Sequence, residues 1–258
     1  MLNFKTVNLI ALILFTALLI LFIMHAISIW WFVLLFSIWF SLTALGSAFV
    51  GWRYHIPILN STENATKNQI ALTFDDGPNP DFTPQVLKLL KLHQAKATFF
   101  CIGKHIENHP ELFNKIIADG HTIGNHTYSH PNNFGFLTTK KVQSELEQTR
   151  NIIKKVSGLT SKLYRPAFGV TNPRIRRAVQ NLNLTTIGWN KRSLDTTNKT
   201  EKTILKRVTK NIKTGDVILL HDTSEKSVRV LEQLLLILRN NNMKSVTIDT
   251  LFKIQAYA

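Results

Sequence analysis

The chain has 258 residues, with 31 Lys and Arg against 16 Asp and Glu, a net charge of +15 at neutral pH. This length suits one domain of moderate size with an appendage. A single cysteine excludes an internal disulfide and a cysteine-rich metal centre, so any metal must be held by His and carboxylate side chains. That cysteine, Cys101, lies in the apolar run 97–102, where we expect a buried, unreactive thiol.

The charge is distributed unevenly along the chain. Residues 1–62 contain two basic side chains, Lys5 and Arg53, and no acidic ones. The remainder therefore holds 29 basic and 16 acidic groups, a net charge of +13. A basic domain of this kind indicates either an anionic neighbour or helix faces coated with lysine, and charge alone does not separate the two.

Residues 1–54 have the composition of a membrane anchor. Two apolar stretches, at about 7–24 and 27–50, are together too long for one spanning helix of about 20 residues but suit two. His25 and its neighbours would form the turn. A cleaved signal peptide is the alternative, but its apolar stretch is short and ends at a small-residue cleavage site, whereas here the apolar character resumes at once.

Residues 68–258, after a polar linker at 55–67, repeat short apolar or β-branched runs followed by segments with helical periodicity. This alternation predicts parallel βα units, and a closed or nearly closed barrel suits it better than an open sheet. The expected strands are 70–74, 97–102, 121–125, 162–165, 185–189, 216–220 and 244–248. The expected helices are 83–92, 110–118, 138–156, 173–182, 201–212 and 227–239.

Polar side chains collect where these expected strands end, which is where βα barrels carry their functional groups. Five of the seven strand ends carry a titratable or cationic side chain, and a random scatter of polar residues would rarely produce that. In chain order they are Asp75 and Asp76, His126 and His130, Arg165, Asp195, and His221.

Two histidines and an aspartate suggest a metal site. His126 and His130 are four residues apart, which would place both imidazoles on one face of a helical turn. Asp76, from another strand end, would complete the ligand set and leave an open position for water. Zinc suits these ligands, and Fe, Co or Ni also fit them. His105 and His109 share the spacing, but no Asp-Asp motif accompanies them, and we interpret them as surface histidines.

The remaining strand-end residues suit acid–base chemistry. Adjacent residues leaving a strand point in different directions, so Asp75 is free to act as general base while Asp76 binds metal. A divalent ion lowers the pKa of bound water from about 15.7 toward about 7, which makes proton removal feasible. Arg165 would orient Asp75 through a charge-assisted hydrogen bond, or form a structural ion pair. His221 is the expected general acid, with a buried core histidine as the alternative.

Four segments resemble, in order, the motifs of NodB-like polysaccharide deacetylases (carbohydrate esterase family 4). They are TFDDGP at 73–78, HTYSH at 126–130, RPAF at 165–168 and ILLH at 218–221. The resemblance covers about residues 68–250. It implies a distorted (β/α)7 barrel, the NodB homology domain, and hydrolysis of N-acetyl groups from amino sugars of chitin oligomers or peptidoglycan.

The resemblance repeats the ligand, base and acid assignments and adds three residues near the substrate. The backbone N–H of Phe168 would help stabilise the tetrahedral oxyanion. Leu219 would line a pocket for the acetate methyl group, and Trp189 would lie beside the substrate.

One motif departs from the family. Where the family often has Asp-x-x-Asp-Trp, this chain has arginine at 192, Asp195, and threonine at 196. If the first aspartate normally tunes the acid histidine, His221 needs another partner, for which Asp195 is the candidate. A positive Arg192 nearby would depress the pKa of His221. We also expect an altered substrate subsite.

The sequence therefore predicts an integral membrane hydrolase that acts on a carbon–nitrogen bond of an N-acetylated glycan. Lys5 and Arg53 flank the same side of the hairpin and favour a cytoplasmic domain, whereas the location of such a polymer favours the outer side. One alternative is a deacetylase or deformylase of a lipid-linked amino sugar. Another is a non-catalytic glycan- or nucleic-acid-binding module, but binding alone does not require both an acid and a base. No nucleic-acid partner is expected.

Overall fold

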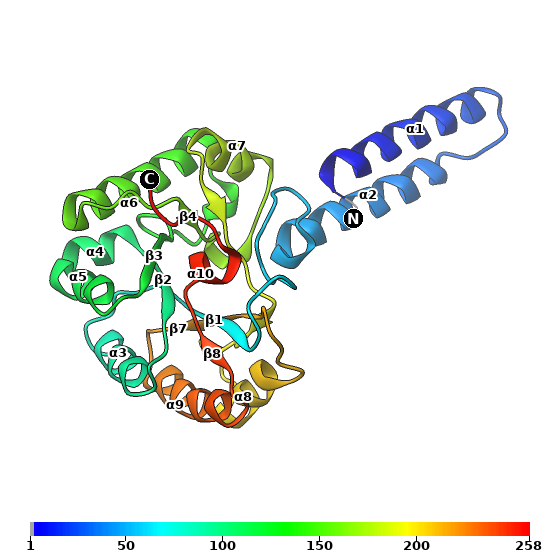
Figure 1. The fold of residues 1–258 in the computed structure, drawn as a ribbon. Coiled ribbons are helices and arrows are strands. Elements are labelled where there is room, and N and C mark those ends of the chain that lie inside the picture. The colour runs from blue at the N-terminus through cyan, green and yellow to red at the C-terminus, as the bar shows by residue number, and fades with distance from the viewer. Residues whose placement is uncertain (1–2) are drawn as a thin grey trace.

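The computed structural model describes residues 3–258, which form a rounded α/β domain and a projecting helical hairpin (Figure 1). The hairpin consists of α1 (Phe4–Ile23) and α2 (Trp30–Ala48), joined by a turn in which His25 has a φ of 55°. By length and composition both helices are able to cross a membrane, and most of their apolar side chains are exposed. Between them, the indole N–H of Trp39 donates to Asn8 Oδ1 at 2.8 Å.

A parallel sheet forms the centre of the domain, in the order β5-β4-β3-β2-β1-β7-β6, with β8 paired to the start of β1. The strands are β1 (Gln69–Asp75), β2 (Ala97–Cys101), β3 (Thr122–Asn125), β4 (Leu163–Tyr164), β5 (Thr185–Thr186), β6 (Lys191–Arg192), β7 (Val217–His221) and β8 (Lys244–Ser245). The predicted βα alternation is confirmed. The barrel was expected to be closed or nearly closed, and the sheet is a half-barrel, since within residues 3–258 no ladder joins β5 to β6.

The helices pack around the outside of this sheet (Figure 1). They are α3 (Thr83–Leu92), α4 (Gly103–Asn108), α5 (Pro110–Ala118), α6 (Thr139–Ser157), α7 (Pro173–Asn181), α8 (Glu201–Thr209), α9 (Glu225–Asn240) and α10 (Ile248–Phe252). Three 3-10 turns, η1 (Val50–Trp52), η2 (Phe134–Phe136) and η3 (Ala167–Gly169), lie in the connections. Side-chain oxygens cap the longer helices: Thr138, Thr200 and Ser224 each accept a backbone N–H from three residues further on.

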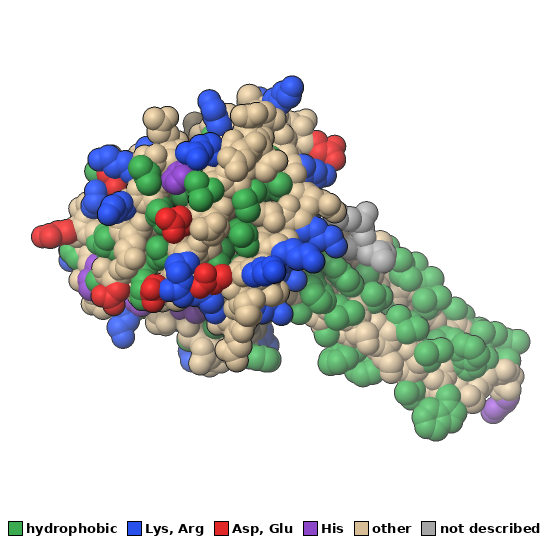
Figure 2. All heavy atoms as spheres, turned by 90° about the horizontal axis from the view of Figure 1, so that it is seen from below, with side chains coloured by type: hydrophobic (Ala, Val, Ile, Leu, Met, Phe, Trp, Pro, Cys, Tyr) green, Lys and Arg blue, Asp and Glu red, His purple; other side chains and the backbone are tan. Residues whose placement is uncertain are grey.

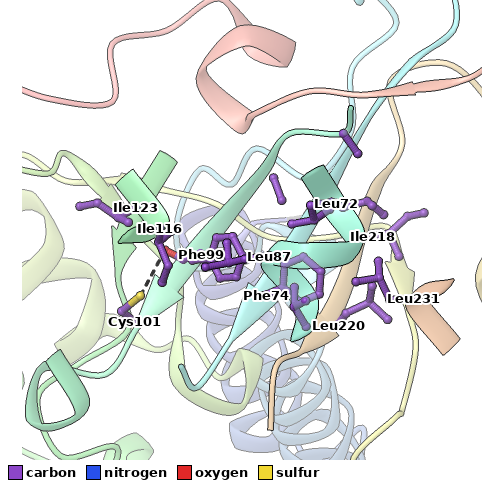
Figure 3. Close-up of a cluster of buried hydrophobic side chains, with 14 of the residues drawn as sticks. Leu72, Phe74, Leu87, Phe99, Cys101, Ile116, Ile123, Ile218, Leu220 and Leu231 are labelled. Atoms are coloured by element: carbon purple, nitrogen blue, oxygen red, sulfur yellow. Dashed lines mark hydrogen bonds between the residues drawn. The ribbon is translucent and has the colours of Figure 1, made fainter. Parts of the chain in front are cut away.

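The pleat of the strands divides the core into two layers. Leu72 and Phe74 of β1 point outward and pack with side chains of the covering helices (Figure 3). Because alternate side chains of a strand face opposite ways, Thr73 and Asp75 point into the half-barrel. Burial of each large apolar side chain contributes about 1.5–3 kcal/mol. The outer layer thus fixes the strands, and the inner face carries the polar groups.

Residues 55–62, which we call the strap, lie in the gap between β5 and β6. Leu59 pairs with Ile187 beyond the end of β5, and the Thr62 N–H donates to Gly215 O at 3.1 Å, just before β7. Ile56 and Ile58 are buried in the inner core. Most of the segment expected to be a polar linker therefore packs into the domain. The side chains of Ile56 and Ile58 fill the space between β5 and β6 with apolar surface.

Candidate active site

The loops that follow β1, β3, β4 and β7 meet at one end of the half-barrel and bring together side chains far apart in the sequence. Asp76 Oδ1 lies 3.4 Å from His126 Nε2 and 3.6 Å from His130 Nε2. Asp76 Oδ2 lies 3.9 Å from His221 Nε2. One donor atom from each of Asp76, His126 and His130 lies within 4.8 Å of the others, which makes a candidate metal centre.

The hydrogen bonding and ionisation of Asp76 and His126 suit a divalent ion. Asp76 Oδ1 is buried and has no hydrogen-bond partner among the described residues, so it is an unsatisfied acceptor aimed between two imidazoles. His126 Nδ1 lies 3.0 Å from the carbonyl of Arg165 and donates to it, which leaves the Nε2 lone pair directed at Asp76. Burial raises the pKa of Asp76, but the facing histidines outweigh burial and hold that pKa well below its usual value. The carboxylate is therefore ionised.

The histidine pair does not lie on a helical turn, so this part of the sequence-based expectation is wrong. Residues 126–130 form an irregular loop in which Thr127 and His130 have φ values of 69° and 48°. The left-handed residues, rather than a helix, turn both imidazoles toward Asp76. Glu145 of α6 holds the loop by accepting the backbone N–H groups of Tyr128 and Ser129 at 3.0 and 2.8 Å.

Asp75 is held from inside the half-barrel by Arg165. The guanidinium is fully buried, and its Nη1 donates to Asp75 Oδ1 at 2.8 Å and to Thr73 Oγ1 at 2.7 Å. Its Nη2 donates to the carbonyl of Gly188 at 2.9 Å. These contacts leave Asp75 Oδ2 facing the ligand cluster, 3.8 Å from His126 Nε2.

His221 is paired with Asp195, the partner expected from the sequence. Asp195 is buried, and its carboxylate accepts His221 Nδ1–H and the His221 backbone N–H, both at 2.8 Å. The hydroxyls of Ser193 and Ser227 also donate to this carboxylate, at 2.7 and 2.9 Å. Burial lowers the pKa of His221, but the hydrogen bond and charge of Asp195 raise it to about 9.

Arg192 does not depress the pKa of His221, contrary to expectation. It is exposed at the register position of Leu219, and its guanidinium carbon lies 5.7 Å from the centre of the Trp189 ring. The Asp195 carboxylate in direct contact with His221 dominates, and the pKa moves upward. Thr196 is exposed.

The three residues expected near the substrate differ in accessibility. Phe168 has a φ of 57°, is 46 % exposed, and places its ring 4.5 Å from that of His130. Across residues 3–258 its backbone N–H donates no hydrogen bond, so this donor is free. Leu219 belongs to the inner core. Trp189 is only 8 % exposed and packs behind η3 beside Arg165, where it supports the loop.

His105 is a site residue that sequence reasoning missed. Its Nδ1 lies 2.8 Å from the carbonyl oxygen of Asp76. Asp76 has a φ of 73°, a left-handed conformation that is unfavourable for a residue with a Cβ. The hydrogen bond from His105 therefore secures a strained residue that carries a carboxylate of the candidate metal centre. The only sequence signal was an HxxxH spacing that we interpreted as surface histidine.

Comparison with known proteins places the chain beside polysaccharide deacetylases. The family described as "Polysaccharide deacetylase" matches residues 62–187. The peptidoglycan-N-acetylglucosamine deacetylase of Bacillus cereus is 34 % identical over 192 residues, which cover 72 % of this chain and 69 % of that protein. The peptidoglycan-N-acetylmuramic acid deacetylase PdaC of Bacillus subtilis is 32 % identical over 205 residues, 79 % of this chain and 43 % of PdaC.

A solved structure agrees with these sequence matches. The crystal structure of a peptidoglycan N-acetylglucosamine deacetylase in complex with a naphthyl N-oxidanyl-benzamide superposes with a TM-score of 0.72 at 32 % identity. The match covers 78 % of this chain and 94 % of that one. The chain therefore belongs to the polysaccharide deacetylases of carbohydrate esterase family 4, hydrolases that act on N-acetyl groups.

Proposed function

We propose that this protein is a membrane-anchored, metal-dependent N-deacetylase of an N-acetylglucosamine polymer, either peptidoglycan or a chitin-like glycan. The observation that carries the proposal is the arrangement at the mouth of the half-barrel. Beside three metal-type ligands lie a carboxylate held by a buried arginine and a histidine held by a buried aspartate, Asp75 and His221, at paired positions of the neighbouring strands β1 and β7. The names of the relatives favour peptidoglycan as the polymer.

The proposed ligands are Asp76, His126 and His130, with zinc as the expected ion and Co, Ni or Fe as alternatives. Their fit rests on the unpartnered Asp76 Oδ1 and on the fixed tautomer of His126. When bound, a divalent ion polarises the acetyl carbonyl and makes water more acidic.

The chain's own residues perform the proton transfers. Asp75 Oδ2 removes a proton from the attacking water, and Arg165 keeps that carboxylate oriented. The Phe168 N–H donates to the oxyanion as the carbonyl carbon becomes tetrahedral. His221 Nε2 then protonates the nitrogen as the C–N bond breaks, which releases acetate and a free amine.

The two exposed apolar helices support the membrane anchor, and the glycan substrates named for the relatives support a catalytic domain on the outer side of the cytoplasmic membrane. The basic side chains of the domain do not oppose this orientation. Large domains translocate largely regardless of their charge, so that only Lys5 and Arg53 bear on sidedness, and the location of the glycan outweighs their preference for the cytoplasmic side in this proposal.

The test is mass spectrometry of chitooligosaccharides and muropeptides after incubation with the zinc-loaded full chain. We expect loss of acetyl groups, which a chelator abolishes and added zinc restores. Asp75→Asn should lower the rate by about 10²–10⁴-fold, as expected for loss of a general base, while the protein still binds zinc. Stoichiometric zinc binding without acetate release from any N-acetylated glycan would contradict the proposal and favour a binding protein.

A lipid-linked amino sugar is the second candidate substrate for deacetylation or deformylation. The observation that favours it is the direct connection between α2 and the strap, which keeps the site near a bilayer that contains the hairpin. Rates on lipid-linked and polymeric substrates in the same vesicles separate the candidates. Turnover of the polymer at equal or higher rate than the lipid-linked sugar would disfavour this alternative.

A further inference from the structure

Most of the net positive charge of the domain comes from one stretch of sequence. Residues 173–211 carry ten Lys and Arg and two acidic residues, a net charge of +8 within a domain whose net charge is +13. We call these cations the basic collar. They are Arg174, Arg176, Arg177, Lys191, Arg192, Lys199, Lys202, Lys206, Arg207 and Lys210.

The collar has almost no acidic partners. Of its two neighbouring acids in sequence, Asp195 is buried against His221 and Glu201 pairs with Arg229 at 2.6 Å. Within the part of the chain that the structure describes, Lys191 alone of the ten cations reaches a carboxylate, that of Asp216 at 3.7 Å. The remaining charge is available to an external anion.

Two elements of the collar, α7 and β6, follow segments that contact the base of the hairpin, and α8 packs against β6. On the α7 side, the Thr171 N–H donates to the carbonyl of Ser47 near the end of α2, at 3.0 Å. On the β6 side, the side chain of Val50 lies against Gly188, two residues before Asn190 and the start of β6. Figure 2 shows Lys and Arg side chains gathered where the hairpin meets the domain.

Part of the collar lines a groove between β6 and α8. This groove has a volume of about 470 Å³, and no acidic residue is among its described lining. The lining residues are Asn190, Lys191, Arg192, Thr203, Lys206, Arg207, Lys210 and Asn211. Lys202 and Lys206 of α8 lie four residues apart on one exposed face, and the exposed Lys210 follows directly after the end of the helix.

We infer that the basic collar binds the anionic phospholipid headgroups of the bilayer that holds the hairpin. The inference rests on the membrane anchoring proposed above. Clusters of Lys and Arg next to a membrane segment are attracted to anionic leaflets, and the collar joins such a cluster to a concave site that accepts phosphate groups. The collar thus forms a second, electrostatic attachment. It holds the side of the half-barrel between β5 and β6 close to the membrane surface.

The test measures the distance between the collar and the bilayer in the full chain. Because Cys101 is fully buried, a cysteine introduced at the surface can be labelled selectively. Asn198→Cys places a fluorophore between β6 and α8, and Asn114→Cys places a matched one on α5, on the opposite side of the domain from the hairpin (Figure 1). Both are reconstituted into vesicles of phosphatidylcholine, with or without phosphatidylglycerol, that contain a headgroup quencher.

We expect the Asn198 probe to be quenched when phosphatidylglycerol is present and to lose that quenching in phosphatidylcholine alone. About 1 M salt should abolish it, because the Debye length then falls to about 3 Å. The Asn114 probe should respond to neither change. Two results would overturn the inference. One is equal quenching of the Asn198 probe in both lipids. The other is quenching that a soluble polyanion abolishes but salt does not.

Charge variants provide the matched control. Lys202→Gln, Lys206→Gln and Lys210→Gln together should remove the lipid-dependent quenching. Lys88→Gln, Lys91→Gln and Lys104→Gln remove the same charge from exposed positions on α3 and α4 and should leave it intact. Equal loss in both triple variants would mean that net charge, rather than the collar, is responsible, and would overturn the inference.

Failure of the collar and failure of the proposed function are distinguishable. Deacetylation of a soluble chitooligosaccharide should be unchanged in both triple variants, since none of the six lysines lies in the site. Lipid-dependent quenching without any deacetylation would leave the collar standing and refute the activity. A full chain that does not float with vesicles of either composition would refute the anchor and the collar together.

Discussion

The ionisation of the His221 side chain depends on a buried carboxylate beside it. Asp195 binds both its ring and its backbone, and two serine hydroxyls fix the carboxylate in turn. With its pKa raised to about 9, His221 is protonated at neutral pH and able to donate a proton. Its availability as an acid should therefore decline only as pH rises through about 9.

Asp195→Asn should move the basic limb of the pH–rate profile downward. Burial lowers the pKa of His221, and without the Asp195 carboxylate only the charges of Asp75 and Asp76 oppose it, so this pKa should fall below about 9. The rate should then begin to fall at a lower pH than in the unchanged protein, with an additional loss of about 10²–10⁴-fold where His221 is no longer protonated. Initial rates on a soluble chitooligosaccharide from pH 5 to 10 measure this shift. An unmoved basic limb would show that His221 is not the acid.

His105→Ala should weaken zinc binding by about 10–100-fold, the usual effect of removing a group that positions a ligand. The hydrogen bond to the carbonyl of Asp76 stabilises the left-handed backbone there, so that its loss misplaces the carboxylate. His109→Ala is the matched control, because the described structure gives the His109 side chain no hydrogen bond. Competition with a fluorescent chelator measures both affinities, and equal values would contradict the role of His105.

At the scale of elements, the sequence predicted the parts of the site that follow directly from local pattern. The ends of β1, β3 and β7 could be located because an apolar strand stops at a polar residue, as at Asp75 and His221. The closure of the sheet could not be predicted, since it depends on whether β5 reaches β6. In the folded chain, Ile187 pairs with the distant Leu59 instead.

The strap and the histidine loop show why local pattern fails. Ile56 and Ile58 sit among polar residues, so composition alone indicated a linker, but their burial depends on contacts with residues more than 100 positions away. The HxxxH spacing correctly predicted that His126 and His130 lie together, but the helical turn predicted for them is not found. Left-handed values at Thr127 and His130 follow from anchoring of the loop to α6, which short-range spacing does not encode.

A soluble fragment that starts at residue 63 should be markedly less stable than one that starts at residue 53. The shorter fragment lacks the strap, and the burial of Ile56 and Ile58 contributes about 3–6 kcal/mol together. For a domain of this size, that corresponds to a Tm lower by roughly 6–24 °C. Thermal unfolding of the two fragments followed by circular dichroism tests this, and equal Tm values would show that the strap is dispensable.

At the scale of the whole molecule, metal binding should couple to the stability of the fold, because it joins the loop after β1, which carries Asp76, to the loop after β3, which carries His126 and His130. Zinc at about 100 times its Kd should raise the free energy of unfolding by about 2.7 kcal/mol. Asp76→Asn should lose most of this stabilisation, whereas Lys88→Gln, far from the site, should keep it. Calorimetry with zinc and with a chelator measures the difference. A zinc-dependent Tm shift in Asp76→Asn equal to that of the unchanged protein would exclude this ligand.

The continuity of α2, η1 and the strap limits where the enzyme can work. Val50 is buried in the inner core, and Ser47 is hydrogen-bonded to the loop before α7. Within residues 3–258, the hairpin therefore joins the catalytic domain without a flexible linker. With the hairpin in a membrane, the catalytic mouth is held at a fixed height above the lipid surface. If the proposed function holds, such an enzyme would deacetylate glycan strands close to the membrane and would not reach strands farther away.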